Sequence, residues 1–125
     1  MTRLREQVRL YAYITRRGGS DNTEALIAAN RAIHLTIDSA AENPRALRVL
    51  TNGRALVEAL RMSYGFRPAR VRRFVTEHHA LLDAIATRDT VKAGAIARSH
   101  CVGAREDMLA GYREVKAKRH VDPAS

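Results

Sequence analysis

Three of the five histidines in the sequence fall on the apolar faces of helices that the hydrophobic pattern predicts. At about 100° of rotation per residue, His34 shares a face with leucine and isoleucine, and His78 shares one with phenylalanine and leucine. His100 lies among mostly small residues, which would leave room around its ring. His79 falls nearer the rim of its helix, and His120 belongs to a charged tail. We therefore predict that three helices each direct one histidine into the same core.

Neutral imidazole is a good ligand for Zn, Ni, Cu, Fe and Co, and an amide oxygen can add a harder fourth contact. Asn30 lies one turn before His34, at the spacing that stacks two side chains on a helix. The alternative is that each histidine is an ordinary core residue with hydrogen-bonded ring nitrogens. Three in so small a chain are harder to explain in that way, because each buried imidazole needs partners for two nitrogens. A shared metal site and structural histidines are both compatible with the spacing.

Two arginines fall inside the apolar arc of the third predicted helix. The residues on this arc are Leu47, Leu50, Arg54, Val57, Arg61 and Tyr64. Because an arginine is rarely buried without an anion, Arg54 and Arg61 are candidates to line a pocket and to bind a carboxylate through two parallel hydrogen bonds. The alternative is an arginine at the edge of the stripe, with its stem packed and its head in water.

Apolar residues recur at intervals of three and four, which predicts an all-α chain. The expected helices cover about 2–17, about 22–41, 44 to about 64, about 68–88, and 89 or 90 to about 118. Their ends are marked by the loop at 17–22, by Asn43-Pro44 as N-cap and first helical residue, and by a cap at Asp89 or Thr90. We predict one domain over residues 1–120, an antiparallel bundle of about five to six helices, and a frayed tail at 121–125.

Composition narrows the class of protein. The chain has 125 residues, about one domain, with 46% hydrophobic and 28% charged residues. It shows no membrane-spanning run and no secretory signal, and its single cysteine, Cys101, predicts a reducing cytoplasm. The formal charge of +9 favours contact with a polyanionic partner such as a nucleic acid. However, the arginines are scattered and only 5% of residues are aromatic, so a solvated basic surface is favoured over direct nucleic-acid binding.

An ordered set of motifs resembles one known domain. The motifs are Asn30-Arg31-Ala32-Ile33-His34, Asn43-Pro44-Arg45-Ala46-Leu47, Glu77-His78-His79-Ala80-Leu81-Leu82-Asp83-Ala84-Ile85, Asp89, and Ala97-Arg98-Ser99-His100. Over roughly residues 3–112, the chain resembles the FCD domain, the C-terminal ligand-binding domain of FadR-type regulators in the GntR family. The resemblance implies an all-helical bundle that senses a small molecule, forms a homodimer and controls an attached winged-helix domain that reads DNA.

The resemblance also implies a metal site. Many members hold a divalent metal through an acidic residue and three histidines, and their effector is commonly an organic acid. By position, His34, His78 and His100 match the histidine ligands, and Asn30 occupies the acidic position. We expect Zn or Ni, with Mn, Fe and Co also compatible. Four neutral ligands would leave the full charge on the ion, which favours an anionic effector with Arg54 or Arg61 as a second contact.

The chain departs from the family in its organisation as well as in Asn30. No winged-helix segment precedes Met1, and the first helix of the family's domain is predicted to be absent, which would leave an apolar groove for a partner subunit or an upstream segment to cover. We expect a cytoplasmic, non-enzymatic sensing domain without membrane contact, which reaches DNA only through a domain outside this chain.

Two other functions are weighed against this one. The first alternative is a basic helical interaction protein with structural histidines. The second is a metal-dependent hydrolase, which would need a carboxylate general base near the metal-bound water. Glu77 points about 100° away from His78 around the helix, and Asp107 lies about two turns beyond His100, so neither carboxylate is well placed.

Overall fold

The computed structural model describes residues 1–18 and 22–121. It contains helices α1 (Thr2–Arg17), α2 (Thr23–Ala40), α3 (Pro44–Tyr64), α4 (Pro68–Ala86) and α5 (Thr90–Val121), and no strand within the described residues. The prediction of an all-α bundle is confirmed. The predicted helix ends agree closely, except that α5 continues to Val121 instead of ending near Lys118. Residues 122–125 of the predicted tail lie outside the described residues.

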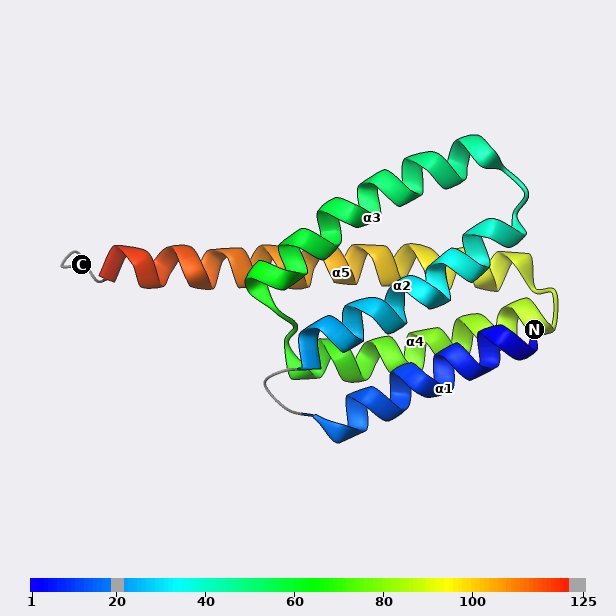
Figure 1. Ribbon diagram of the computed structural model, residues 1–125, viewed down its shortest axis with the longest axis horizontal. Coiled ribbons are helices and arrows are strands. Elements are labelled where there is room, and N and C mark those ends of the chain that lie inside the picture. The colour runs from blue at the N-terminus through cyan, green and yellow to red at the C-terminus, as the bar shows by residue number, and fades with distance from the viewer. Residues whose placement is uncertain (19–21, 122–125) are drawn as a thin grey trace.

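Figure 1 shows the long helix α5 running the length of the bundle and extending past the other helices at its C-terminal end. Helix α1 packs against α2 and α4, and α5 packs against α4 and α3. Helix α3 contacts α2 and α5 and leans away from the other helices toward the α2–α3 connection (Figure 1). The molecule is therefore a compact group of α1, α2, α4 and α5, with α3 laid across one side.

Local sequence signals set the helix starts. The Asn43 side chain accepts a hydrogen bond from the Ala46 amide at 3.0 Å, and the Asp89 side chain accepts one from the Lys92 amide at 2.9 Å. Both predicted caps are confirmed. Asn22 precedes α2 but makes no cap bond with its side chain; its Nδ2 instead donates to the Ile14 carbonyl at 2.9 Å, which ties the start of α2 to the end of α1. The remaining predicted cap residues, 19–21, lie outside the described residues.

The apolar core comes from the inward faces of three helices. Its buried residues are Leu4, Val8 and Tyr11 of α1, Leu26, Ala29 and Ile33 of α2, and Val71, Phe74 and Leu82 of α4. The intervals of three and four residues place each set on one side of its helix, as the sequence pattern predicts. This core fixes the mutual positions of the helices that carry His34 and His78.

Helix α3 does not pack as the sequence predicts. Leu50 and Val57, which were expected to be buried, are exposed, and the buried residue of α3 is Arg61. The side of α3 that faces the bundle is charged: Arg54 pairs with Asp38, Glu58 with Arg31, and Arg61 with Asp107. Of the predicted arc, Arg54 and Arg61 face the bundle whereas Leu50 and Val57 are exposed, so ion pairs, rather than leucine and valine, hold α3 to α2 and α5.

The buried pair between Arg61 and Asp107 generates a prediction about stability. Their side chains are 4% and 5% exposed, so Asp107→Ala would leave an unpaired guanidinium in a desolvated site. We expect it to lower the free energy of unfolding by about 3–5 kcal/mol. The double variant Arg61→Met, Asp107→Leu should recover most of this loss, because it removes both charges. Urea unfolding measures both effects.

Removing the exposed pair between Arg67 and Glu114 provides the control. Glu114→Ala should change the free energy of unfolding by only about 0–1 kcal/mol. Equal losses for Asp107→Ala and Glu114→Ala would contradict the role of the buried pair in anchoring α3.

Candidate metal centre

Three helices bring the three predicted histidines together. His34 comes from α2, His78 from α4 and His100 from α5, and one potential ligand atom of each lies within 4.8 Å of the others. The ring centroids are 5.6 Å apart for His34 and His78, 5.1 Å for His34 and His100, and 4.9 Å for His78 and His100. The predicted convergence of the three inward faces is confirmed. A Zn–N bond is about 2.0–2.1 Å long. Displacements of the ring nitrogens of about an ångström would therefore bring all three within bonding distance of one ion.

Aromatic packing fixes the orientation of these rings. The Tyr11 ring meets the fully buried His78 edge-on, with centroids 4.9 Å apart. Phe74 lies 4.6 Å from the ring of His100 and stacks near-parallel on His78. The cluster is therefore held by the same core that holds the helices, and its rings have little freedom to turn away.

Several polar atoms around the cluster are buried without a hydrogen-bond partner within the described residues. They are Nδ1 and Nε2 of His78 and the hydroxyl oxygen of Tyr11, and Oδ1 of Asn30, one turn before His34 on α2, is buried and unpaired as well. Leaving a buried polar atom unpaired costs about 1–3 kcal/mol, so most such atoms are satisfied in folded proteins. Imidazole nitrogen and amide oxygen are donors that a divalent transition metal accepts. The residues present therefore fit a metal, and an ordinary structural histidine would have its nitrogens bonded.

Glu77 orients His100. Nδ1 of His100 donates to Oε2 of Glu77 at 2.8 Å, which leaves the lone pair of the neutral ring on Nε2. Arg70 and Arg73 also donate to the Glu77 carboxylate, at 2.9 and 3.1 Å. A carboxylate behind a histidine is the usual outer partner of a metal-binding imidazole, because it fixes the tautomer and raises the basicity of the ring.

The three rings are neutral at physiological pH. Burial lowers the pKa of His34 from 6.5 to about 3 and that of His78 to about 2, and repulsion from His100 acts in the same direction. Burial also lowers the pKa of His100, although its bond to Glu77 opposes this shift. Neutral imidazole is the form that binds a metal.

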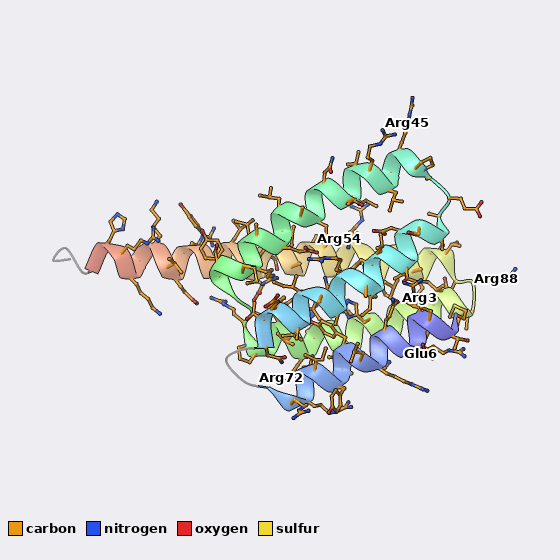
Figure 2. All side chains as sticks on the ribbon, in the orientation of Figure 1. Arg3, Glu6, Arg45, Arg54, Arg72 and Arg88 are labelled. Carbon is orange, nitrogen blue, oxygen red and sulfur yellow. The ribbon has the colours of Figure 1, made fainter. Side chains whose placement is uncertain are left out.

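The predicted effector residues occupy different surroundings. Arg54 is half-buried and points from α3 toward α2, where it pairs with Asp38 (Figure 2). Arg61 donates to Asp107 and to the carbonyls of Gly65 and Ala104. The alternative interpretation placed each guanidinium in water at the edge of the apolar stripe, and the structure does not show that arrangement for either residue. Both are paired with carboxylates of the protein itself.

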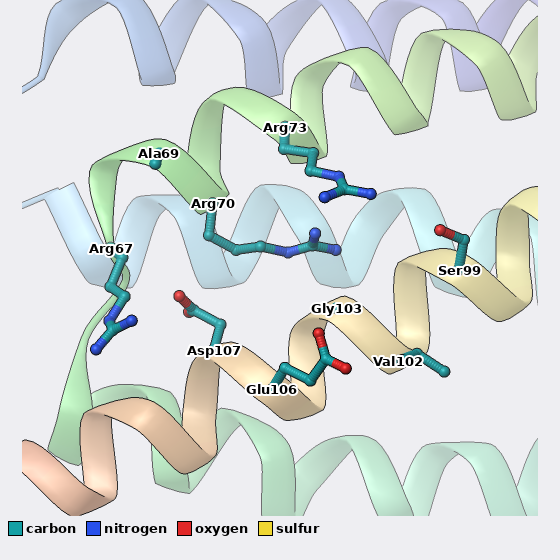
Figure 3. Close-up of a pocket in the computed structure, with 9 residues that line it drawn as sticks. All are labelled: Arg67, Ala69, Arg70, Arg73, Ser99, Val102, Gly103, Glu106 and Asp107. Atoms are coloured by element: carbon teal, nitrogen blue, oxygen red, sulfur yellow. The ribbon is translucent and has the colours of Figure 1, made fainter.

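A separate pocket of about 400 Å³ lies between α4 and α5, and none of the three histidines lines it. Figure 3 shows Arg70 reaching across Gly103, with Arg73 above it and Asp107 facing Arg67. A Cβ at Gly103 would overlap the Arg70 guanidinium, so a glycine at this position makes room for Arg70. Arg70 donates from this place both to Glu77 and to the His100 carbonyl, and therefore supports the centre from behind.

A family model described as the FCD domain matches residues 2–103. The chain belongs to the FCD domain family. This confirms the family predicted from the sequence motifs, and His34, His78 and His100 lie within the matched range. The FCD domain is a regulatory, effector-binding domain of GntR/FadR-type regulators, which act together with a DNA-binding domain. No curated protein and no solved structure gives a match. None of the helices in the described part of the chain is long and apolar enough to cross a bilayer.

Two residues that contact the histidine cluster were not predicted from the sequence. Tyr11 reads as an ordinary apolar-face residue of α1, and only the fold brings its hydroxyl beside His78. From the sequence, Glu77 was weighed only as a general base for a metal-bound water, and judged poorly placed because it points away from His78. Its actual partner is His100, which is 23 positions away on another helix. The adjacent Glu77-His78 pair and the nearby Arg70 and Arg73 were the available signals, but they do not specify the partner.

The low pKa values of the buried histidines generate a prediction about stability and pH. Below pH 6.5 the unfolded chain protonates His34 and His78, whereas the folded protein keeps them neutral until pH about 3 and about 2. Without metal, stability should therefore fall as the pH decreases from 7 to 5, by up to about 1.4 kcal/mol per pH unit for each histidine. Urea unfolding in the presence of a chelator at several pH values measures this slope.

His34→Gln should reduce the slope, because it removes one of the three imidazoles whose pKa is lowered by burial. His79→Gln is the matched control, since that ring is exposed, and it should retain the slope of the unmodified protein. An unchanged slope in His34→Gln would show that other groups cause the pH dependence.

Proposed function

We propose that this chain is the effector-sensing domain of a GntR/FadR-type bacterial transcriptional regulator, and that it binds a divalent metal together with a small organic acid. The observation that carries the proposal is the cluster of His34, His78 and His100, with ligand atoms within 4.8 Å of one another and both nitrogens of His78 buried with no partner among residues 1–18 and 22–121. The alternative of a basic interaction protein with structural histidines does not account for those unpaired nitrogens.

The proposed ligands are the three histidines and Asn30, whose Oδ1 is buried and unpaired within the described residues. This set suits Zn or Ni, and Mn, Fe and Co are compatible with it. A bound metal would supply positive charge and an electrophilic contact for an oxygen ligand. Glu77 would act as a positioning residue, since it holds the tautomer of His100 that leaves Nε2 available.

A small carboxylate is the effector that the charges favour. Four neutral ligands would not offset the charge of a divalent ion, and Arg54 lies near enough to contribute to the lowered pKa of His34. Arg54 could exchange the Asp38 carboxylate for that of the effector. Arg61 is the second proposed contact, although it is buried and already donates to three acceptors. In this proposal, binding of the effector would alter DNA binding by a winged-helix domain attached to the same homodimer. The regulator would act in the cytoplasm.

Metal titration tests the proposal. We expect about one equivalent of Zn or Ni per chain by calorimetry, and we expect His34→Ala and His78→Ala to abolish binding because each removes a ligand. His79→Ala, next to His78 but exposed, is the control and should bind as the unmodified protein does. The metal-loaded protein should then gain thermal stability with small carboxylic acids but not with their neutral amides.

Absence of binding in excess metal would overturn the metal centre. Equal stabilisation by acids and amides would overturn the carboxylate effector while leaving the metal centre intact.

Two conservative substitutions separate ligand charge from ligand orientation. Asn30→Asp should tighten metal binding, because a carboxylate adds negative charge at the same position. Glu77→Gln should weaken binding by about 10–100-fold, because the amide no longer fixes the tautomer of His100 with a charged acceptor. Calorimetry at constant pH measures both. A Glu77→Gln protein with unchanged affinity would contradict the positioning role, and circular dichroism checks that its fold is retained.

A further inference from the structure

His78 has one more ring nitrogen than a shared metal ion can use. Both Nδ1 and Nε2 are buried without a hydrogen-bond partner within the described residues. The two nitrogens of an imidazole point in different directions, so only one of them can face an ion shared with His34 and His100. The other nitrogen carries a proton in the neutral ring, and a metal-binding histidine almost always donates that proton to a neighbouring acceptor. His78 therefore needs a second partner when a metal is bound.

The rings around His78 leave one candidate for this partner. Two of the rings that contact it, His34 and His100, are themselves proposed ligands. Phe74 stacks on His78 and has no polar side-chain atom. Tyr11 meets His78 edge-on, with ring centroids 4.9 Å apart. The Tyr11 residue is 0% exposed, and its hydroxyl oxygen is buried with no partner in the described part of the chain.

The packing of the helices suits this assignment. Helix α4 contacts both α1 and α5, and Figure 1 shows it between these two helices. Tyr11 therefore reaches His78 from α1, whereas His100 reaches it from α5. Neighbours on different sides suit an imidazole that needs a separate partner for each of its nitrogens.

We propose that Tyr11 is a positioning residue for His78, and that in the metal-bound protein its hydroxyl oxygen accepts a hydrogen bond from the ring nitrogen that does not face the ion. The displacement of about an ångström that metal binding requires of the rings also moves His78 relative to Tyr11. Tyr11 then fixes the tautomer of His78, as Glu77 fixes that of His100. This inference rests on the proposed function, because it takes the histidine cluster to be a metal site.

The hydroxyl group also has a proton of its own to donate. Gln7 lies one turn before Tyr11 on the same face of α1, at a spacing that makes side chains neighbours. Its Oε1 is buried and unpaired within the described residues, so it offers an acceptor for this proton. Polar groups that are unpaired without metal would become paired with it. The Tyr11 hydroxyl therefore adds to the metal affinity although it is not a ligand.

Zinc titration of Tyr11→Phe tests the inference. Phenylalanine keeps the ring that packs on His78 and removes only the hydroxyl, so we expect the affinity for zinc to fall by about tenfold or more. Tyr13→Phe is the matched control, because it removes the same atom from a 49% exposed residue whose hydroxyl accepts a hydrogen bond from Arg17. The control should bind zinc as the unmodified chain does. Circular dichroism checks that both variants keep their fold.

Two further measurements separate positioning from packing. The Tyr11 hydroxyl is unpaired in the described structure, so the urea midpoint of metal-free Tyr11→Phe should be unchanged or higher. A hydroxyl with a purely structural role would already be bonded, and its removal would lower that midpoint. In proton spectra of the zinc-loaded protein, the imidazole N–H resonance of His78 should change position in Tyr11→Phe and stay in place in Tyr13→Phe.

An unchanged zinc affinity in Tyr11→Phe would overturn the positioning role, and so would a lower urea midpoint of the metal-free variant. Either result leaves the metal centre intact, because the unmodified chain still binds zinc. Failure of the proposed function looks different. In that case neither the unmodified chain nor the two variants would bind zinc in excess metal, and the role of Tyr11 would be overturned with it.

Discussion

The desolvation of three imidazoles is the constraint around which this bundle is arranged. A histidine in water changes charge near neutral pH, whereas His34 and His78 are held neutral because the core surrounds them with apolar side chains. The cost is two ring nitrogens of His78 with no partner in the described protein. Such an arrangement lowers the free energy of unfolding, because buried polar atoms lose their hydrogen bonds to water. The remaining contacts of α1, α2 and α4 must offset that loss, and the continuous core of these helices is where they do so.

The support for this cluster extends outward through one chain of contacts. Gly103 leaves space for Arg70, whose guanidinium also packs 4.2 Å from the Phe74 ring. Arg70 donates to Glu77, and Glu77 accepts from Nδ1 of His100. Each link has a different physical basis, namely steric room, cation–π contact and charge-assisted hydrogen bonding. The orientation of a buried ring therefore depends on a glycine on the far side of an arginine, on the wall of a separate pocket.

Much of this architecture could be predicted from the sequence, because helix signals are local. Asn43-Pro44 and Asp89 mark helix starts through contacts within one turn, and the period of apolar residues places the three histidines inward. Pairing between helices is not local. Arg61 could be recognised as an unusual residue, but its partner Asp107 is 46 positions away. The same limit concealed the bond between Glu77 and His100, and the rotation of α3 that exposes Leu50 and Val57.

Helix α3 illustrates why an apolar stripe alone does not reveal which side a helix buries. One side of α3 can form ion pairs with a neighbouring helix, and the other can make apolar contacts. Which side faces the bundle depends on the positions of Asp38 and Asp107. Asp38 is one turn beyond His34 on α2, and Asp107 is about two turns beyond His100 on α5. His34 and His100 therefore face each other between α2 and α5, and the arginines of α3 bridge the same two helices. The position of α3 is therefore fixed by the same two helices that carry His34 and His100.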